Sequence, residues 1–157
     1  MKPGTYVIVL AGLLVLQILV IPLFSILDIV PDVVLIAIMY LAMTEGAVPA
    51  LLAAVFAGLI RDAFSTHFLG ANMLALVISA FLTGVAFKQQ EKLNFQAQTV
   101  YMFAILFLHH LLYYGIYLLD QQLGFFQLLF RFALPGALYT LAVAAIAHFL
   151  LPKGFWR

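Results

Sequence analysis

Long apolar runs, separated by short polar or helix-breaking segments, dominate the pattern along this 157-residue chain. A helix needs about 20 apolar residues to cross about 30 Å of hydrocarbon. We therefore expect six membrane-spanning helices, with bounds near residues 5–27, 31–44, 47–64, 71–87, 99–119 and 132–151. The rest of the chain suffices only for tails and short connectors. The pattern thus predicts one all-α membrane domain, residues 1–157, without an extramembrane domain.

Individual residues refine these runs. Pro22 is expected to kink the first run, and Asp32 to place a carboxylate at one membrane surface. Arg61 is expected to extend its charged head toward the lipid headgroups. Residues 120–131 mix glutamines with phenylalanines, which is typical of an interfacial segment. Pro135 falls in the first turn of the last expected helix, where proline is tolerated.

The composition excludes most soluble classes of protein. Hydrophobic residues make up 67% of the chain and charged residues 8%, whereas soluble domains have about 45–50% and about 25%. The net charge of +1 offers no basic patch for nucleic acid. The absence of cysteine excludes a disulfide, a thiolate nucleophile and a cysteine metal site.

Lysines and arginines predict the orientation, because cytoplasmic loops are enriched in both. Six spans with both termini in the cytoplasm place five of these residues inside and two outside. The five are Lys2, Lys88, Lys92, Lys153 and Arg157, and the two are Arg61 and Arg131. A single span over residues 33–60 would place three inside and four outside. A re-entrant hairpin over the same residues gives the same charge count as two spans. Only the side of the membrane on which Glu45 is exposed distinguishes the hairpin from two spans.

Four residues of the fifth run predict a polar cluster inside the membrane. His109 and His110 diverge by about 100° on a helix, so we expect no shared metal. Tyr113 and Tyr114 follow four residues later on the same two faces and could share hydrogen bonds with them. One interpretation of the cluster is hydrogen bonding between helices. The other is a functional role, as a polar pocket or as a contact for a partner. Signatures such as His-Glu-x-x-His and Gly-x-Ser-x-Gly are absent from the sequence, so we expect no catalysis, cofactor or metal.

Small residues recur every four positions on three of the runs. They are Ala50, Ala54 and Gly58 on the third run, Ala71, Ala75, Ser79 and Thr83 on the fourth, and Gly136, Thr140 and Ala144 on the sixth. Such stripes let helix backbones approach closely, either within one bundle or against a partner helix.

Asp62 follows the small residues of the third run, so its carboxylate is expected to face the close-packed side of the helix. A carboxylate there must be paired, capped by backbone N–H groups, or protonated. It either accepts backbone N–H bonds in the connection to the fourth run or contacts an external partner. Both roles can hold at once.

Three short segments, in order and spacing, form a recognisable pattern. Residues 31–38 read Pro-Asp followed by an apolar run, residues 58–62 read Gly-x-x-x-Asp, and residues 69–70 read Leu-Gly before the next run. In these features the chain resembles the MreD family of bacterial rod shape-determining membrane proteins. With Ala54 of the stripe, the candidate partner-binding or structural positions are Pro31, Asp32, Ala54, Gly58, Asp62 and Gly70.

The resemblance implies a non-enzymatic scaffold subunit of the cell-wall elongation complex, in the bacterial cytoplasmic (inner) membrane. It implies MreC as a direct partner, bound through its transmembrane helix. MreB filaments, RodA and a class B penicillin-binding protein are implied as indirect partners, and a role in rod cell shape and peptidoglycan synthesis follows. The fold it implies is a compact bundle similar to the substrate-binding subunits of energy-coupling-factor transporters.

That shared fold leaves a second function open, namely a vitamin-type substrate-binding subunit of a transporter. The pair His109 and Tyr113 would suit such a site. The first run, however, lacks the Ala-x-x-x-Ala pair with which those subunits usually dock, since only Ala11 and Gly12 are small there. A lipid-handling enzyme, a third possibility, has no supporting motif.

Overall fold

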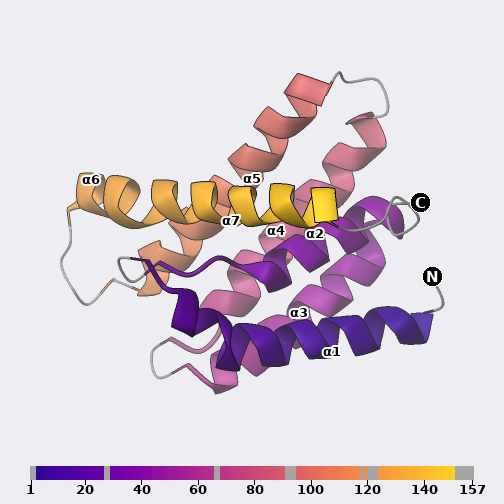
Figure 1. Cartoon of the computed structure of the whole chain (residues 1–157), viewed down its shortest axis with the longest axis horizontal. Helices are drawn as coiled ribbons and strands as arrows, with labels where there is room; N and C mark the ends of the chain where they lie inside the picture. Colours follow the sequence, from indigo (N-terminus) through magenta and orange to yellow (C-terminus); the bar gives the residue numbers. More distant parts are fainter. Residues whose placement is uncertain are drawn as a thin grey trace.

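The chain folds as a helical bundle, which confirms the all-α prediction (Figure 1). This computed structural model describes residues 3–26, 29–65, 68–90, 95–117, 119 and 124–150. Its elements are α1 (Pro3–Leu19), the 3-10 helix η1 (Ile21–Phe24), α2 (Val33–Thr44), α3 (Ala47–Ala63), α4 (Ala71–Gln90), α5 (Phe95–Tyr117), α6 (Phe125–Gln127), the π-helix η3 (Leu128–Ala133) and α7 (Leu134–Leu150). Four charges that set the predicted orientation, Lys2, Lys92, Lys153 and Arg157, lie outside the described residues.

Helix α2 is the centre of the bundle and packs against α1, α3, α4 and α7. It begins where the Asp32 carboxylate accepts the Leu35 N–H at 2.9 Å, an N-cap bond, and it ends before Gly46. Gly46 has a φ of 95°, a left-handed conformation that lets the chain reverse into α3. The side chains of Val34 and Ile38 are fully buried. Central packing of this short helix therefore supplies the largest of the fully buried apolar side chains, together with Leu76 of α4.

The small-residue stripe of α3 packs against the backbone of α4. Ala50, Ala54 and Gly58 are buried, and so is Ala75 on α4. A Cβ atom on Gly58 would lie 2.3 Å from the Met73 Cα, a distance that no real side chain tolerates. The α3 stripe therefore serves internal packing, because the backbone of α4 already occupies the surface that a partner helix would need. Ser79 of the α4 stripe faces His109 on α5.

The outer surface of the bundle is apolar. On α1, the side chains of Val7 and Ile8 are 68% and 74% exposed. Two helical stretches among the described residues, Gln96–Ile116 and Phe125–Ala147, are long and apolar enough to cross a membrane, and most of each stretch is not buried in the bundle. An apolar exterior of this extent would not stay dispersed in water. It is the surface expected of a protein surrounded by lipid.

The first helix is shorter than its apolar run. Helix α1 ends at Leu19, and the chain continues as η1, with Pro22 in its first positions. Because proline lacks the N–H that an α-helix needs and clashes with the preceding turn, a helix rarely continues smoothly through it. The run to residue 27 thus ends with a helix break near Pro22, where the sequence suggested a kink.

The last helical segment begins earlier than predicted. Elements α6, η3 and α7 follow one another without a break from Phe125, so part of the expected interfacial segment is helical. Pro135 lies within this segment rather than in its first turn. The wider π-helical turns of η3, which end at Ala133, immediately precede it. We attribute this local widening to the missing proline N–H, which leaves a carbonyl of the preceding turn without its usual partner.

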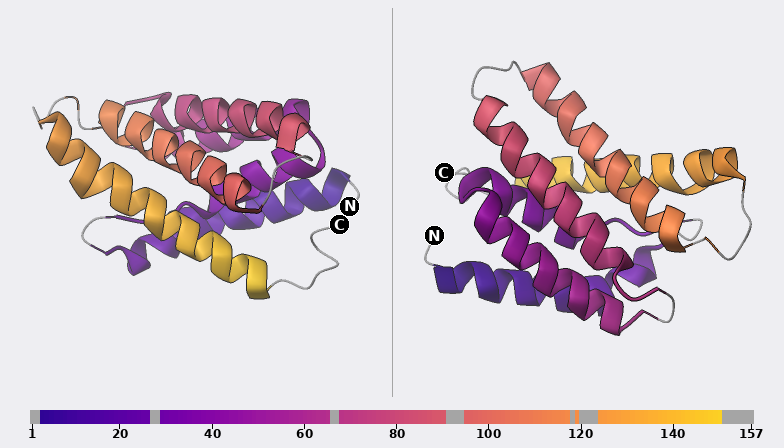
Figure 2. Two further views of the ribbon diagram at one scale, coloured as in Figure 1. Left: turned by 90° about the horizontal axis from the view of Figure 1, so that it is seen from above. Right: turned by 180° about the vertical axis from the view of Figure 1, so that it is seen from behind.

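The two ends of the bundle are distinct. At one end, the Tyr6 hydroxyl donates to the Glu45 carboxylate at 2.8 Å. At the other end, the Gln17 side chain contacts the backbone beside Asp32. The hairpin of α2 and α3 therefore extends along α1 from Gln17 to Tyr6. Figure 2 shows that α1 begins and α7 ends at the same end of the molecule.

Candidate functional site

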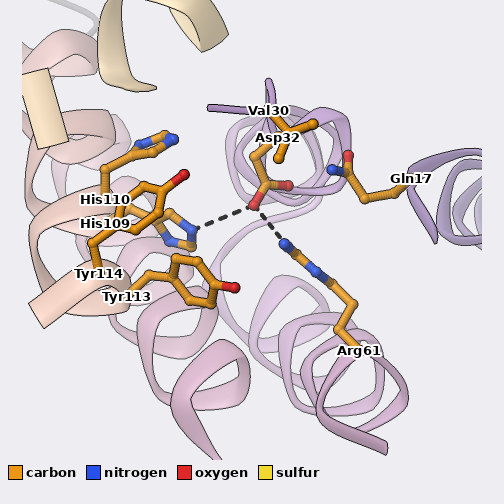
Figure 3. A pocket seen from close by; sticks show the side chains of 8 residues that line it. All are labelled: Gln17, Val30, Asp32, Arg61, His109, His110, Tyr113 and Tyr114. Carbon is orange, nitrogen blue, oxygen red and sulfur yellow. Dashed lines mark hydrogen bonds and ion pairs between the residues drawn. The ribbon is translucent and has the colours of Figure 1, made fainter. Parts of the chain in front are cut away.

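Polar side chains from α1, α3 and α5 meet the start of α2 near one end of the bundle (Figure 3). They surround a cavity of about 180 Å³. Its lining residues are Gln17, Val30, Asp32, Arg61, His109, His110, Tyr113 and Tyr114. Thr140 on α7 lies behind this wall and bonds to two of its members. We call these eight lining residues the polar cavity.

Asp32 is the central residue of the polar cavity. Its Oδ1 atom caps α2, and its backbone N–H donates to the Thr140 hydroxyl at 3.2 Å. Its Oδ2 atom faces Arg61 and His109, as Figure 3 shows. The sequence placed this carboxylate at a membrane surface. In the structure this side chain is turned into the bundle, where it is only 7% exposed and is held by groups from three other helices.

Arg61 forms a buried ion pair with Asp32. The guanidinium Nη1 donates to Oδ2 at 2.7 Å, and the arginine side chain is 14% exposed. The expectation that Arg61 extends toward the headgroups is therefore wrong. A charged donor gains more from a carboxylate in a poorly solvated interior than from the lipid–water boundary. The pair fixes the end of α3 against the start of α2.

Gln17 holds the segment that precedes α2, and the sequence gave no role to it. Its Nε2 donates to the Pro31 carbonyl at 3.1 Å, and its Oε1 accepts the Val33 N–H at 2.8 Å. Pro31, a candidate of the sequence, is thus buried and held through its backbone. The sequence did contain a sign of this role, because Gln17 is a lone amide side chain within an apolar run. Such a group must find a hydrogen-bond partner inside a membrane.

His109 contacts groups on two other helices. Its Nδ1 lies 3.1 Å from the Ser79 hydroxyl, and its Nε2 lies 3.4 Å from Asp32 Oδ2. Ser79 donates its hydroxyl proton to the Ala75 carbonyl at 2.8 Å, so toward His109 it acts as the acceptor. His109 thus links α5 to Ser79 on α4 and to the carboxylate at the start of α2.

His110 has a different arrangement. Its Nδ1 lies 2.8 Å from the Leu106 carbonyl, so this nitrogen carries a proton. Its Nε2 lies 3.4 Å from the Thr140 hydroxyl, which can donate to it. Gly136 makes room for the ring, because a Cβ atom there would lie 2.5 Å from the His110 ring. A neutral imidazole therefore satisfies these contacts.

The two tyrosines complete the wall. The Tyr114 ring stacks on His110 with centroids 6.2 Å apart, and it contacts Tyr113 edge to face at 5.1 Å. The two histidines, predicted to diverge, both line the polar cavity with ring centroids 5.4 Å apart. The four residues of the predicted cluster are thus together, and Asp32 and Arg61 join them from other helices. Among the described residues, no group of three or more histidine, aspartate or glutamate side chains is placed to hold a metal ion.

Asp62 lies outside the polar cavity and caps the connection to α4. Its Oδ1 accepts from the backbone and side-chain nitrogens of Asn72, at 3.0 and 2.9 Å. Its Oδ2 accepts the N–H groups of Gly70 and Met73, at 3.0 and 3.1 Å. Gly70 has a φ of 98°, which a residue with a side chain rarely adopts. The predicted capping role of Asp62 is confirmed, and Gly70 belongs to the same turn.

The match to known families decides what kind of protein this is. The family model described as rod shape-determining protein MreD matches residues 4–153, nearly the whole chain. The chain belongs to the MreD family. No curated protein and no solved structure matches it in the corresponding comparisons. Similarity to transporter substrate-binding subunits therefore stays a prediction.

Membership in the MreD family gives the molecule a biological setting. It supports a role in determining rod cell shape, as a structural protein of a membrane family. The apolar exterior and the two long apolar helices agree with that setting. The motif positions of the MreD pattern have structural roles here: Asp32 and Asp62 cap the starts of α2 and α4, and Gly58 allows α3 and α4 to touch.

Proposed function

We propose that this chain is a non-enzymatic, multi-pass scaffold of the cell-wall elongation complex in the cytoplasmic membrane, and that it binds MreC. The family match over residues 4–153 carries the proposal. The structure adds physical support. Polar groups are turned inward and paired with one another, while the exterior offers apolar helix faces. Such a molecule suits association with other helices in lipid through packing.

In this proposal the chain crosses the membrane six times with both termini in the cytoplasm. We favour two full spans for α2 and α3 over a re-entrant hairpin. Glu45, which lies between these two helices, bonds to Tyr6 near the start of α1, so the α2–α3 turn lies at the same end of the bundle as the start of α1. With 12 residues, α2 is only about 18 Å long. Its central position shields it from lipid, so it need not match the full bilayer thickness.

The MreC helix would bind on the outer surface. The α3 stripe lies against the backbone of α4, and both stripes are largely buried, so they leave no room for an added helix. This changes how interface variants should be chosen. Gly58→Leu, an obvious variant from the sequence alone, would separate α3 from α4 and so damage the fold itself. A test of partner binding must therefore use the protein without core substitutions.

Affinity purification in mild detergent tests the scaffold proposal. We expect tagged chain, co-expressed with MreC, to recover MreC in near-equal amounts, with RodA and the class B penicillin-binding protein recovered only when MreC is present. An unrelated single-span protein expressed at the same level is the control. Recovery of MreC no greater than that of the control, together with unchanged rod shape in cells that lack the chain, would contradict the proposal.

The polar cavity is the observation that favours the second candidate, a vitamin-binding transporter subunit. At about 180 Å³ it is smaller than the usual ligand pocket of about 300–1,000 Å³. A vitamin-sized molecule would therefore require the helices to part. Mass spectrometry of the purified protein distinguishes the candidates, since a stoichiometric bound vitamin would favour the transporter function.

A further inference from the structure

The central helix α2 has one face that the bundle does not cover fully. Its buried side packs into the hydrophobic core. The side chains on the opposite side follow one another at helical spacing and are only half-buried. They are Val33, Ile36, Ala37 and Tyr40. We call these four residues the open face of α2.

The helices around α2 form an incomplete ring, which explains why this face is open. In order around α2, α1 contacts α3, α3 contacts α4, α4 contacts α5, and α5 contacts α7. Helices α1 and α7 both pack against α2, but the described residues of these two helices do not contact each other (Figure 1). The open face therefore lies at the bottom of a recess between α1 and α7. The Tyr139 hydroxyl of α7 donates to the Phe24 carbonyl at 3.0 Å and so closes one end of this recess.

The other end of the recess carries a carboxylate. Glu45 directly follows α2, is exposed, and accepts a hydrogen bond from the Tyr6 hydroxyl of α1 at 2.8 Å. Within the part of the chain that the structure describes, Glu45 forms no ion pair. The hydrocarbon tail of a lipid offers nothing to such a group. A membrane-spanning helix does, because lysine and arginine are enriched just beyond its cytoplasmic end.

The shape of the open face also suits a helix. Ala37 has the smallest side chain of the four residues and lies in the middle of the face. Small residues at such a place let a second helix backbone approach closely, and close packing drives association where lipid supplies no hydrophobic push. The side chains around Ala37 are apolar or aromatic, so they would pack against the same helix. The recess thus combines an apolar floor with one acidic end.

We propose that a single membrane-spanning helix of a partner lies along the open face of α2, between α1 and α7. A lysine or arginine beyond the cytoplasmic end of that helix pairs with Glu45. This inference rests on the scaffold proposal, which names MreC as the partner and places the start of α1, and with it Glu45, on the cytoplasmic side. It adds the binding surface, which the scaffold proposal leaves open.

Photo-cross-linking in cells that co-express the full chain with MreC tests this surface. The cross-linking residue benzoylphenylalanine replaces Tyr40 of the open face or Val143, which lies one turn beyond Tyr139 on α7. Phe81 of α4 and Leu52 of α3, both more than half exposed, are the control positions on other outer surfaces. We expect a product with MreC from Tyr40 and Val143 and none from the controls.

The outcomes separate this inference from the scaffold proposal. If MreC is recovered with the chain but cross-links only from the control positions, or equally from all four, the location is wrong and the scaffold proposal stands. If MreC is not recovered at all, both are wrong.

Two variants test the contacts themselves. Ala37→Trp fills the middle of the open face, and we expect it to lower MreC recovery about tenfold. Ala104→Trp, at an exposed position of α5, is the matched control and should recover MreC as the natural chain does. Glu45→Gln keeps an acceptor for Tyr6 but removes the charge, and we expect a loss of about threefold. Equal recovery by folded Ala37→Trp and Ala104→Trp proteins would refute the location, and full recovery by Glu45→Gln would refute the charge pairing.

Discussion

Replacing Arg61 with methionine is expected to lower the free energy of unfolding by about 3 kcal/mol. Methionine keeps much of the side-chain volume but leaves the buried carboxylate of Asp32 without its main partner, now 2.7 Å away. A buried charge that loses its partner is far more costly than the pair itself is worth. His109, at 3.4 Å, is too distant from the carboxylate to replace the arginine fully.

Unfolding of the purified protein by a denaturing detergent, followed by circular dichroism, measures this effect. The double variant Asp32→Asn with Arg61→Met should recover much of the loss, because asparagine still caps α2 and carries no charge. Arg131→Met is the matched control; that arginine is exposed over the Phe132 ring, so its loss should cost under about 1 kcal/mol. A double variant no more stable than Arg61→Met alone would contradict the ion-pair explanation.

Replacing Asp62 with alanine is expected to cost a similar amount, about 3 kcal/mol, because it leaves four N–H donors without their acceptor. Three of these donors are backbone groups in the turn that starts α4. Gly70 is held there in a left-handed conformation, and the loss of its bond to Asp62 would free this turn. The packing of α3 against α4 begins at the same place, so the damage would spread along both helices.

Two further variants separate the cap from other causes. Asp62→Asn keeps one acceptor oxygen and should lose about half as much stability as Asp62→Ala. Asn72→Ala removes only one of the four donors and should cost about 1 kcal/mol. Thermal unfolding in detergent ranks the three variants by their stability. An Asp62→Ala protein as stable as the natural chain would exclude the capping role.

Local patterns allowed part of this structure to be predicted from the sequence. The capping role of Asp62 followed from its position after a small-residue stripe and before a glycine turn, all within a few residues. The apolar runs predicted the helices themselves, because hydrophobicity and helix length are properties of neighbouring residues. The aromatic and histidine cluster of α5 was found for the same reason, since residues four apart share a helix face.

Long-range pairing could not be predicted in the same way. Arg61 and Asp32 are far apart in the chain, and local reasoning placed both at membrane surfaces. Each charge is buried only because the other is there, which depends on how three helices pack. Gln17 was missed because its partners are backbone atoms of the segment before α2, whose position the apolar pattern does not specify.

Element boundaries depended on proline more than the hydrophobic pattern suggested. Helix α1 stops short of Pro22, although the residues that follow it are as apolar as those before it. Pro135, by contrast, is accommodated within a helical segment by the π-turns of η3. The same residue type thus ends one helix and is tolerated in another, and the difference comes from the local backbone rather than from composition.

Cysteine accessibility in living cells tests most directly the proposal that the chain crosses the membrane six times, with its polar cavity at the outer end. The natural chain has no cysteine, so Glu45→Cys and Leu69→Cys each provide a single reactive group at an exposed position. We expect a membrane-impermeant maleimide to label Leu69→Cys in intact cells, and Glu45→Cys only after permeabilisation. Labelling of Glu45→Cys in intact cells, or protection of Leu69→Cys in them, would contradict this arrangement.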